Sequence, residues 1–419
     1  MNRITVQGGR VIDPANQVDQ IQDVHIADGK IVALGARPDG FTTDRMINAE
    51  GRWVIPGLVE LSARPASLAA ESHAAVASGV TTLCIPPSAK PCIDTPAEAE
   101  LLYLRGRQSD AARVYVIGGL TQNLDGERLT EMGALAAAGC VALSNDRRPV
   151  TNTLVLRRAL EYAASHGLTV LLYAKDPWLH QQGCAHEGPI ASRLGLPAIP
   201  IAAETVGLGR DLALVELTKA RVHFCRLSSS EAVEMIHAAR DRGLPVSADV
   251  AIHHLYFCDE DLDGYDPNFR VDPPLRSSND RDRLRRGVAE GTLSAICSDH
   301  EPLGDDAKRA PYPQALPGIS GIETLLSQTL ALAKHNLMPL STAIARVTCD
   351  PAAILGLELG HLAVSAAADL CVIDPDRQWS FSVESQRSAG HNSPLIGRTM
   401  TGVVTHTLVG GHLVYQHEG

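Results

Sequence analysis

The sequence contains few aromatic residues, no CxxC pair and no apolar run of membrane-spanning length. Phe, Trp and Tyr make up 4% of the 419 residues, whereas hydrophobic residues make up 45%, so aliphatic side chains must fill the core. A membrane span needs roughly 20 consecutive apolar residues, and the first residues, MNRITVQGGRVIDP, have no apolar signal core. Nine scattered cysteines without CxxC spacing favour free thiols in a reducing compartment. We therefore expect a cytoplasmic protein.

An excess of positive charge is also missing. The formal net charge is −11 at pH 7, which argues against a broad surface for nucleic acid or anionic lipid. A chain of 419 residues is longer than one small core requires, so we expect one large domain and one smaller domain. The composition thus predicts neither nucleic-acid nor membrane partners.

Both ends of the chain have the pattern of β-structure. VHIADGKIVALG, residues 24–35, places Ala-Asp-Gly-Lys between two apolar, β-branched runs, which is typical of a hairpin. ADLCVIDP, residues 368–375, and GVVTHTLVGGHLVY, residues 402–415, predict further strands near the C-terminus. Because the two ends resemble each other and differ from the middle, we predict a small β-sandwich domain formed by residues 1–55 and 356–419.

The middle of the chain alternates short apolar runs with helical patterns. Runs such as GVTTLCIPP, ARVYVIGGL and LSAICSDHEP end in small or polar residues. In the helical stretch SEAVEMIHAARDRG, Ala232, Val233, Ile236 and Ala239 share one face, and Ser230 is placed to cap the helix. Continuous apolar strands alternating with helices are typical of a parallel sheet covered on both sides. About seven such units predict an α/β fold with a (β/α)8 TIM-like barrel.

A barrel of this kind places its active site at the carboxyl ends of the strands. We predict the barrel to span residues 56–355, and its strand ends then carry the polar residues Ser62, Arg64, Ser88, Asn145, Asp146, Tyr173, Lys175, Arg226, His253, His254, Asp299 and His300. A two-zinc hydrolase needs imidazoles and carboxylates that converge on the metals, whereas this set has few imidazoles and many cations. His253 and His254 are adjacent, so only one of them could face a pocket from a strand.

Several stretches resemble dihydroorotases of the amidohydrolase superfamily. They include VIPGLVEL, GVTTL, SRLGLP, RVHFCRLSSSEAVEMI, NFRVDPPLR, SDHEP and AADLCVIDP, and they run through nearly the whole chain. The resemblance implies an amidohydrolase-type barrel. For the catalytically active members of the family, the resemblance also implies a zinc site whose first two ligands are a His-x-His pair.

The residues that the resemblance places at the metal site differ from those of the working members. The His-x-His positions fall on Ser62 and Arg64, the bridging Lys or Asp falls on Asn145 or Asp146, and two further His positions fall on Tyr173 and Arg226. Asp299 alone stands where the family has its metal-bound, proton-transferring carboxylate. These replacements imply a degenerate metal site.

The substrate-binding positions implied by the resemblance are also altered. The Arg-Glu-Pro-Gly loop that grips substrate is missing from PASLAAESHAAVASG, and the substrate-binding Asn aligns with Ser88. Lys175 stands in place of a Glu, and Leu303 replaces a His that closes over substrate. The alterations therefore extend beyond the metal ligands.

A metal would meet repulsion at these positions. A dication among Arg64, Lys175 and Arg226 would be repelled by up to about 4 kcal/mol per unit-charge pair at about 4 Å, and Arg cannot deprotonate to become a ligand. Without metal, nothing lowers the pKa of water from about 15.7 toward 7. We expect no metal, a structural ion pair between Asp299 and Arg64 or Arg226, and a hydrogen-bonding or packing role for His300.

These expectations predict a catalytically inactive dihydroorotase homologue of pyrimidine biosynthesis, a pseudoenzyme without cofactor. Non-catalytic homologues of this kind occur in some bacteria as assembly partners of the aspartate carbamoyltransferase catalytic chain. The resemblance therefore implies that chain as the partner here, and with it an oligomeric protein.

An active zinc-dependent dihydroorotase is the first alternative that the sequence leaves open. It would interconvert N-carbamoyl-L-aspartate and dihydroorotate, a cyclic amidohydrolase reaction. Asp299 would then move the proton, and Asp146, His254 or His300 would serve as zinc ligands. Stoichiometric zinc in the purified protein would favour this alternative.

An anion-binding regulatory module is the second alternative. Arg64, Lys175 and Arg226 would form a basic pocket in an acidic protein. Guanidinium groups bind carboxylates well, so the ligand would be a small carboxylate such as carbamoyl-aspartate. Thermal stabilisation by carboxylates would favour this module.

Overall fold

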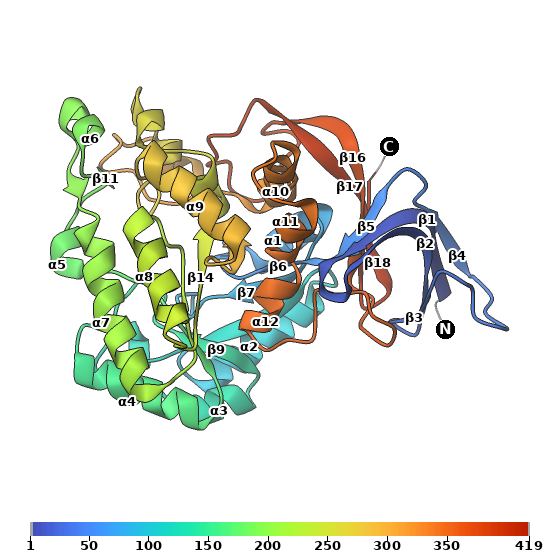
Figure 1. The fold of residues 1–419 in the computed structure, drawn as a ribbon, viewed down its shortest axis with the longest axis horizontal. Helices are drawn as coiled ribbons and strands as arrows, with labels where there is room; N and C mark the ends of the chain where they lie inside the picture. The colour runs from blue at the N-terminus through green and yellow to red at the C-terminus, as the bar shows by residue number, and fades with distance from the viewer. Residues whose placement is uncertain (1–2, 418–419) are drawn as a thin grey trace.

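The computed structural model describes residues 3–417, which form a barrel on one side and a sheet from both chain ends on the other (Figure 1). The strands of the terminal sheet are β1 (Arg3–Asp13), β2 (Val18–Ala27), β3 (Lys30–Leu34), β4 (Arg45–Asn48), β5 (Trp53–Pro56), β16 (Leu370–Phe381), β17 (Arg398–Val409) and β18 (His412–Gln416). Their order is β18-β17-β16-β5-β1-β2-β3, with β4 paired to β1. The two ends therefore share one sheet. The first two and last two residues of the predicted small domain lie outside the described residues.

The joint between the two chain ends lies at β5 and β16. These strands pair antiparallel, with Val54 opposite Val372, and both side chains are buried with Ile4, Val6 and Leu370 in one apolar cluster. The predicted hairpin is confirmed, because β2 and β3 pair antiparallel around residues 28–29.

Eight parallel strands form the barrel, in agreement with the predicted fold class. They are β6 (Leu58–Glu60), β7 (Val80–Ile85), β8 (Arg113–Gly119), β9 (Cys140–Ser144), β10 (Thr169–Leu172), β13 (Val222–Phe224), β14 (Val246–Ala251) and β15 (Ala295–Cys297), and they are neighbours in this order. The first and last strands meet just beyond their ends. The His300 amide donates to the Ser62 carbonyl at 3.0 Å, and the Arg64 amide donates to the His300 carbonyl at 2.8 Å. These bonds join β6 and β15 at the carboxyl edge of the barrel.

Helices surround the barrel (Figure 1). They are α1 (Leu68–Ala77), α2 (Pro96–Gln108), α3 (Met132–Ala137), α4 (Thr153–Ser165), α5 (Pro177–His180), α6 (Pro189–Leu194), α7 (Ala202–Thr218), α8 (Ser230–Asp241), α9 (Ser278–Glu290), α10 (Leu325–Lys334), α11 (Leu340–Ala345) and α12 (Cys349–Ile354). A short parallel pair, β11 (Ala185–His186) and β12 (Ala198–Ile199), lies between α5 and α7 in the chain. Short 3-10 helices cover residues 14–16, 122–124, 252–255, 259–262, 267–269, 305–308 and 322–324.

A separate apolar cluster fills the barrel interior. Every barrel strand contributes to it within its span or one residue beyond, through Leu61, Cys84, Ile117, Ala142, Leu171, Cys225, Ala251, Ala295 and Cys297. Small and aliphatic side chains thus fill the barrel interior, as expected for a sequence with few aromatic residues. All nine cysteines are free thiols. Within residues 3–417, no helix combines the length and the hydropathy needed to cross a membrane.

Two local predictions need correction. Helix α8 is capped by Ser229, whose hydroxyl accepts from the Ala232 amide, so the predicted cap Ser230 is the first helical residue. The described structure also ends β14 at Ala251, and His253 and His254 lie in a 3-10 helix. Strand alternation therefore does not apply to this pair, and both side chains are buried.

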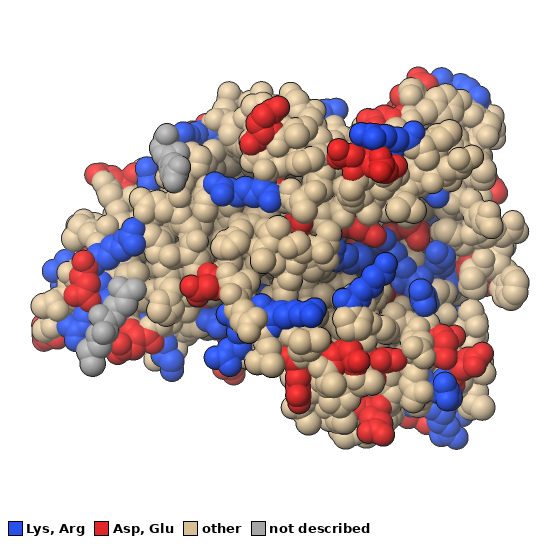
Figure 2. All heavy atoms as spheres, turned by 180° about the vertical axis from the view of Figure 1, so that it is seen from behind, with Lys and Arg blue, Asp and Glu red and all other residues tan. Residues whose placement is uncertain are grey.

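The surface carries charges of both signs. On the face shown in Figure 2, Lys and Arg side chains are interspersed with Asp and Glu, and several basic side chains gather around a central hollow.

Candidate functional site

Three barrel strands end in the same unusual backbone conformation. Asp146, Arg226 and Asp299 each lie two residues beyond the end of a strand, namely β9, β13 and β15. Their φ angles are +51°, +56° and +47°, in the left-handed region that costs a non-glycine residue roughly 1–2 kcal/mol. Such conformations gather at active sites and ligand sites. The ends of these three strands at the barrel mouth therefore have the backbone geometry that is typical of a functional site.

These three side chains meet Arg64 and Ser62 in a buried cluster. Arg64 contacts both oxygens of Asp146, with its Nε donating to Oδ2 at 3.1 Å, and its Nη1 donates to Oδ1 of Asp299 at 2.8 Å. Arg226 Nη1 donates to Ser62 Oγ at 3.1 Å, and its Nη2 lies 3.4 Å from Asp146 Oδ1. Ser62 Oγ donates to Asp299 Oδ1 at 3.1 Å. The ion pairs expected for Asp299 are thus present, and Arg64 links two carboxylates.

Arg147 is a member of this cluster that the sequence reasoning missed. Its Nη2 donates to Asp299 Oδ2 at 2.7 Å, and its Nη1 donates to Glu301 Oε2 at 2.6 Å. Arg147 directly follows Asp146, and this position in LSNDRR was the available signal. Three guanidiniums, of Arg64, Arg147 and Arg226, therefore face the three carboxylates of Asp146, Asp299 and Glu301, so the formal charges cancel.

The guanidiniums keep the buried carboxylates ionised. Burial alone would raise the pKa of Asp299, but Arg147, Arg226 and Arg64 outweigh it and hold this pKa well below its usual value. Burial likewise acts to raise the pKa of Asp146, and Arg64 and Arg226 lower it overall. Asp299 accepts on Oδ1 from Ser62 and Arg64 and on Oδ2 from Arg147. It is consequently a charged, fully engaged group at neutral pH.

Asp146, rather than Asn145, faces the cluster. The Asn145 side chain bonds instead to Thr121, whose amide donates to Asn145 Oδ1 at 3.1 Å. Asp146 Oδ2 also accepts from Ser88 Oγ at 2.6 Å. Ser88 therefore takes part in the cluster through a carboxylate of the protein itself.

Tyr173 and Lys175 converge on Asp272, a second residue that the sequence reasoning missed. Tyr173 Oη donates to Asp272 Oδ1 at 2.8 Å, and Lys175 Nζ donates to Oδ2 at 3.2 Å. His180 Nε2 lies 3.1 Å from Oδ1. The Arg226 guanidinium lies 5.1 Å from the centre of the Tyr173 ring. Lys175 thus has a carboxylate partner, and the tyrosine ring packs beside the arginine cluster.

Glu60 ties the first and last barrel strands together behind the cluster. Its Oε1 accepts from the Ser62 amide at 2.8 Å, and its Oε2 accepts from the Ser298 amide at 2.7 Å. The carboxyl group is fully buried, and burial raises its pKa to about 7. Glu60 therefore positions the backbone on which Ser62 and Asp299 stand.

The histidines near the mouth are neutral or belong to structural contacts. Burial lowers the pKa of His253 far below its usual value and that of His254 to about 4. His254 Nε2 lies 3.2 Å from the Pro273 carbonyl. His300 Nε2 lies 2.9 Å from Glu71 Oε2, in line with its expected hydrogen-bonding role.

Among the described residues, one group has the spacing of a metal site, formed by His223, Cys225 and Asp249. Both ring nitrogens of His223 already have partners, Ser247 Oγ at 2.8 Å and Asp249 Oδ2 at 2.9 Å. The other oxygen of Asp249 accepts from the Arg226 amide. These contacts indicate a satisfied network in the barrel core.

The space left at the cluster is small. A cavity of about 10 Å³ lies among Ser62, Asp146, Tyr173, Arg226 and Asp249, which is about the volume needed for one water molecule. The polar groups around it are hydroxyls, a phenol, a guanidinium and the Cys225 thiol, whose pKa is raised by burial so that the thiol stays protonated. The two carboxylates are engaged, Asp146 by Arg64 and Asp249 by His223. Guanidinium has no acceptor atom to offer a metal, and zinc sites use imidazole, thiolate and carboxylate ligands. This donor set does not fit zinc.

Comparison with known proteins gives the chain's relatives. The dihydro-orotase-like family matches residues 51–232, and the amidohydrolase family matches residues 218–415. A dihydroorotase-like protein of Pseudomonas aeruginosa is 46% identical over 99% of this chain and 100% of its own length. A protein of Anaeromyxobacter dehalogenans named dihydroorotase is 41% identical over 98% of this chain and 97% of its own.

Solved structures with the same fold have lower identity. An L-hydantoinase from Arthrobacter aurescens superposes with a TM-score of 0.87 at 23% identity, covering 99% of this chain and 96% of its own. A dihydropyrimidinase from Brevibacillus agri gives a TM-score of 0.84 at 21% identity, with 99% and 95% coverage. These structures share the fold of the barrel and the terminal sheet.

Proposed function

Because this chain belongs to the dihydroorotase-like family of amidohydrolases, we propose that it is a member without catalytic activity that serves as an assembly partner of the aspartate carbamoyltransferase catalytic chain. One observation is the main support for the proposed lack of activity. Arg64, Arg147 and Arg226 supply the positive charge that balances Asp146 and Asp299, where a zinc hydrolase would use metal ions.

Such a site lacks the metal-activated water that a zinc-dependent dihydroorotase reaction needs as its nucleophile. Zinc lowers the pKa of bound water from about 15.7 to about 7, and a guanidinium offers no open coordination position for water. Asp299, the remaining carboxylate of the reaction, is held by Arg64, Arg147 and Ser62. A base must reach the proton it abstracts within hydrogen-bonding distance, and both oxygens of Asp299 already accept hydrogen bonds from groups of the protein.

The assembly role is supported by the contrast between scaffold and site. The barrel and the terminal sheet are complete, and the match to relatives runs over 99% of the chain. A scaffold kept intact while its mouth is filled by ion pairs fits a protein whose role is contact with another chain. Pyrimidine biosynthesis is the pathway in which such a partner would act.

The test is reconstitution with the aspartate carbamoyltransferase catalytic chain of the same organism. Size-exclusion chromatography with light scattering should show a complex larger than either protein alone. The same preparation, supplied with zinc, should show no turnover of dihydroorotate or N-carbamoyl-L-aspartate. Separate elution of the two folded proteins at micromolar concentrations would overturn the assembly role, and turnover would overturn the loss of activity.

An active zinc-dependent dihydroorotase is the second candidate. It is favoured by the name of the 41% identical Anaeromyxobacter relative. Turnover that rises with added zinc and disappears in Asp299→Ala would establish it. The anion-binding module has less support, because Arg64, Lys175 and Arg226 each have a carboxylate partner within the protein.

A further inference from the structure

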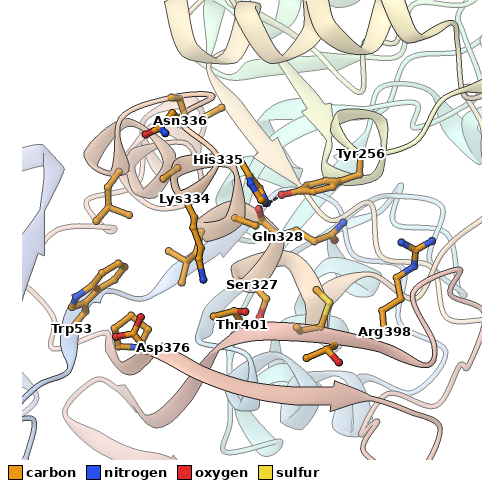
Figure 3. A pocket seen from close by; sticks show the side chains of 18 of the residues that line it. Trp53, Tyr256, Ser327, Gln328, Lys334, His335, Asn336, Asp376, Arg398 and Thr401 are labelled. Carbon is orange, nitrogen blue, oxygen red and sulfur yellow. Dashed lines mark hydrogen bonds between the residues drawn. The ribbon is translucent and has the colours of Figure 1, made fainter.

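A cavity of about 920 Å³ lies between the terminal sheet and the barrel, away from the arginine cluster (Figure 3). Trp53 of β5, Lys334 of α10, and Arg398 and Thr401 of β17 line it. Arg64, Asp146, Arg226 and Asp299 are not among its lining residues. Ligand pockets have volumes of about 300–1,000 Å³, so this cavity has the size of a small-molecule site.

Two cations in the cavity have no acidic partner. Lys334 and Arg398 are exposed residues, and within residues 3–417 neither side chain makes a hydrogen bond or an ion pair. The Arg398 guanidinium lies 6.0 Å from the centre of the Phe257 ring. Every cation of the barrel mouth, in contrast, is paired with a carboxylate. Asp376 is the single acidic lining residue. The lining therefore has a positive formal charge in a chain whose net charge is −11, which favours an anionic ligand.

A buried amide donor in the lining also has no partner. Gln328 is 3% exposed, and its Oε1 accepts from Thr324 Oγ1 at 3.1 Å, whereas its Nε2 has no partner. In the view of Figure 3, the Gln328 side chain lies between Tyr256 and Arg398. An unpaired buried donor costs about 1–3 kcal/mol, and a ligand oxygen at this place would relieve that cost.

The rest of the lining suits a flat, partly apolar ring. Trp53 is half-buried, and Figure 3 shows its indole on the side of the cavity where Lys334 and Asp376 also lie. Met338 and Met400 add polarisable thioethers to the lining, and such side chains adapt to aromatic groups. The cavity thus joins an aromatic wall to two unpaired cations.

We propose that this cavity binds a small metabolite that joins a planar heterocycle to a phosphate, of the size of a nucleoside monophosphate. The ring packs against Trp53, the phosphate lies beside Lys334 on the same side of the cavity, and Thr401, Gln328 and Arg398 offer further donors along the cavity. Phosphate accepts charge-assisted hydrogen bonds from Arg and Lys that are stronger than neutral ones. This proposal is independent of whether the barrel mouth is catalytic.

The test is calorimetric titration of the full chain with UMP and AMP, with uridine and inorganic phosphate as partial ligands. We expect saturable binding of at least one nucleotide with a Kd below about 1 mM. Uridine lacks the phosphate and inorganic phosphate lacks the ring, so each should bind at least about tenfold more weakly, equivalent to about 1.4 kcal/mol. Quenching of tryptophan fluorescence should accompany nucleotide binding and disappear in Trp53→Phe.

Charge reversal in and outside the cavity provides the matched comparison. Lys334→Glu should raise the nucleotide Kd at least about tenfold, and Arg398→Gln should raise it as well. Lys30→Glu, an exposed position on β3 with the same change of charge, should leave the Kd unchanged. The proposal is overturned if neither nucleotide saturates, if inorganic phosphate alone binds as tightly, or if Lys334→Glu and Lys30→Glu give the same Kd.

Discussion

Replacement of Asp299 by Asn tests whether the mouth of the barrel is a structural ion cluster. The substitution keeps the shape of the side chain and removes the charge that Arg64 and Arg147 contact at 2.8 and 2.7 Å. Arg226 Nε also lies close to this carboxylate, 3.5 Å from Asp299 Oδ1. The Asp299 side chain is 2% exposed, so solvent cannot take over the role of the lost partner.

The expected loss of stability follows from these distances. Two unit charges about 2.8 Å apart attract by about 6 kcal/mol at an effective dielectric near 20. Part of this is offset because the variant no longer buries a carboxylate charge. Breaking a buried pair from one side costs about 3–5 kcal/mol, and we expect Asp299→Asn to lie in that range. With an unfolding entropy of about 2.1 cal/mol/K per residue, a chain of 419 residues should lose about 3–6 °C of Tm.

Calorimetry and urea unfolding measure this loss. The matched control is Asp306→Asn, which removes an exposed carboxylate whose side chain is 94% exposed beside Arg309 and should change stability by less than about 0.5 kcal/mol. An active metal enzyme without bound metal would respond in the opposite way, because its carboxylates would repel one another. Equal stabilities of the two variants, or a gain in Asp299→Asn, would refute the assignment of a structural cluster.

Three further predictions concern acid, base and metal. The pKa values of Asp299 and Asp146 are lowered on folding, so the stability they contribute is present above about pH 4 and lost as pH falls through the folded values; Asp299→Asn should show a shallower loss of Tm between pH 5 and pH 3. Burial lowers the pKa of Lys308 to about 7, so this group favours folding as pH rises from about 7 to 10; relative to the wild type, Lys308→Met should lose stability over that range in urea unfolding. The double variant Ser62→His, Arg64→His leaves the other two cluster arginines in place, so mass spectrometry should find no stoichiometric zinc in it, and one zinc per chain would contradict the role of those arginines.

The fold could be predicted from the sequence because its signals are local. Continuous apolar strands between amphipathic stretches define a barrel, and the turn at residues 28–29 defines the first hairpin. The predicted cap of α8 lies one residue too late because Ser229 and Ser230 are equally suited to capping by residue type, and only the folded structure distinguishes them. Ser230 Oγ donates to Asp280 instead.

Site residues could be predicted from the sequence only where the end of a strand fixed their position in the barrel. Ser62, Arg64, Asp146, Arg226 and Asp299 lie at such ends, and the structure brings them together. Their partners depend on loop conformation. Which of two neighbouring side chains faces inward depends on the left-handed turn at Asp146, which the sequence does not reveal.

The cluster residues that the sequence did not predict lie in loops, where the strand pattern does not fix the position of a side chain. Arg147 reaches the cluster from the position after that turn. Asp272 comes from a loop about 100 residues along the chain from its partner Tyr173, and Glu301 lies beyond the last strand. Long-range ion pairing has no spacing rule in sequence, so only the folded chain shows that each mouth cation has a partner.

The metal content of the purified protein tests the central claim most directly. The chain should be expressed in medium with added zinc, dialysed against metal-free buffer and measured by plasma mass spectrometry, with dihydroorotate turnover recorded on the same sample. Arginine pairing at Asp146 and Asp299 predicts zinc well below one ion per chain and no turnover. One or two zinc ions per chain that are lost in Asp299→Ala, together with turnover, would contradict it.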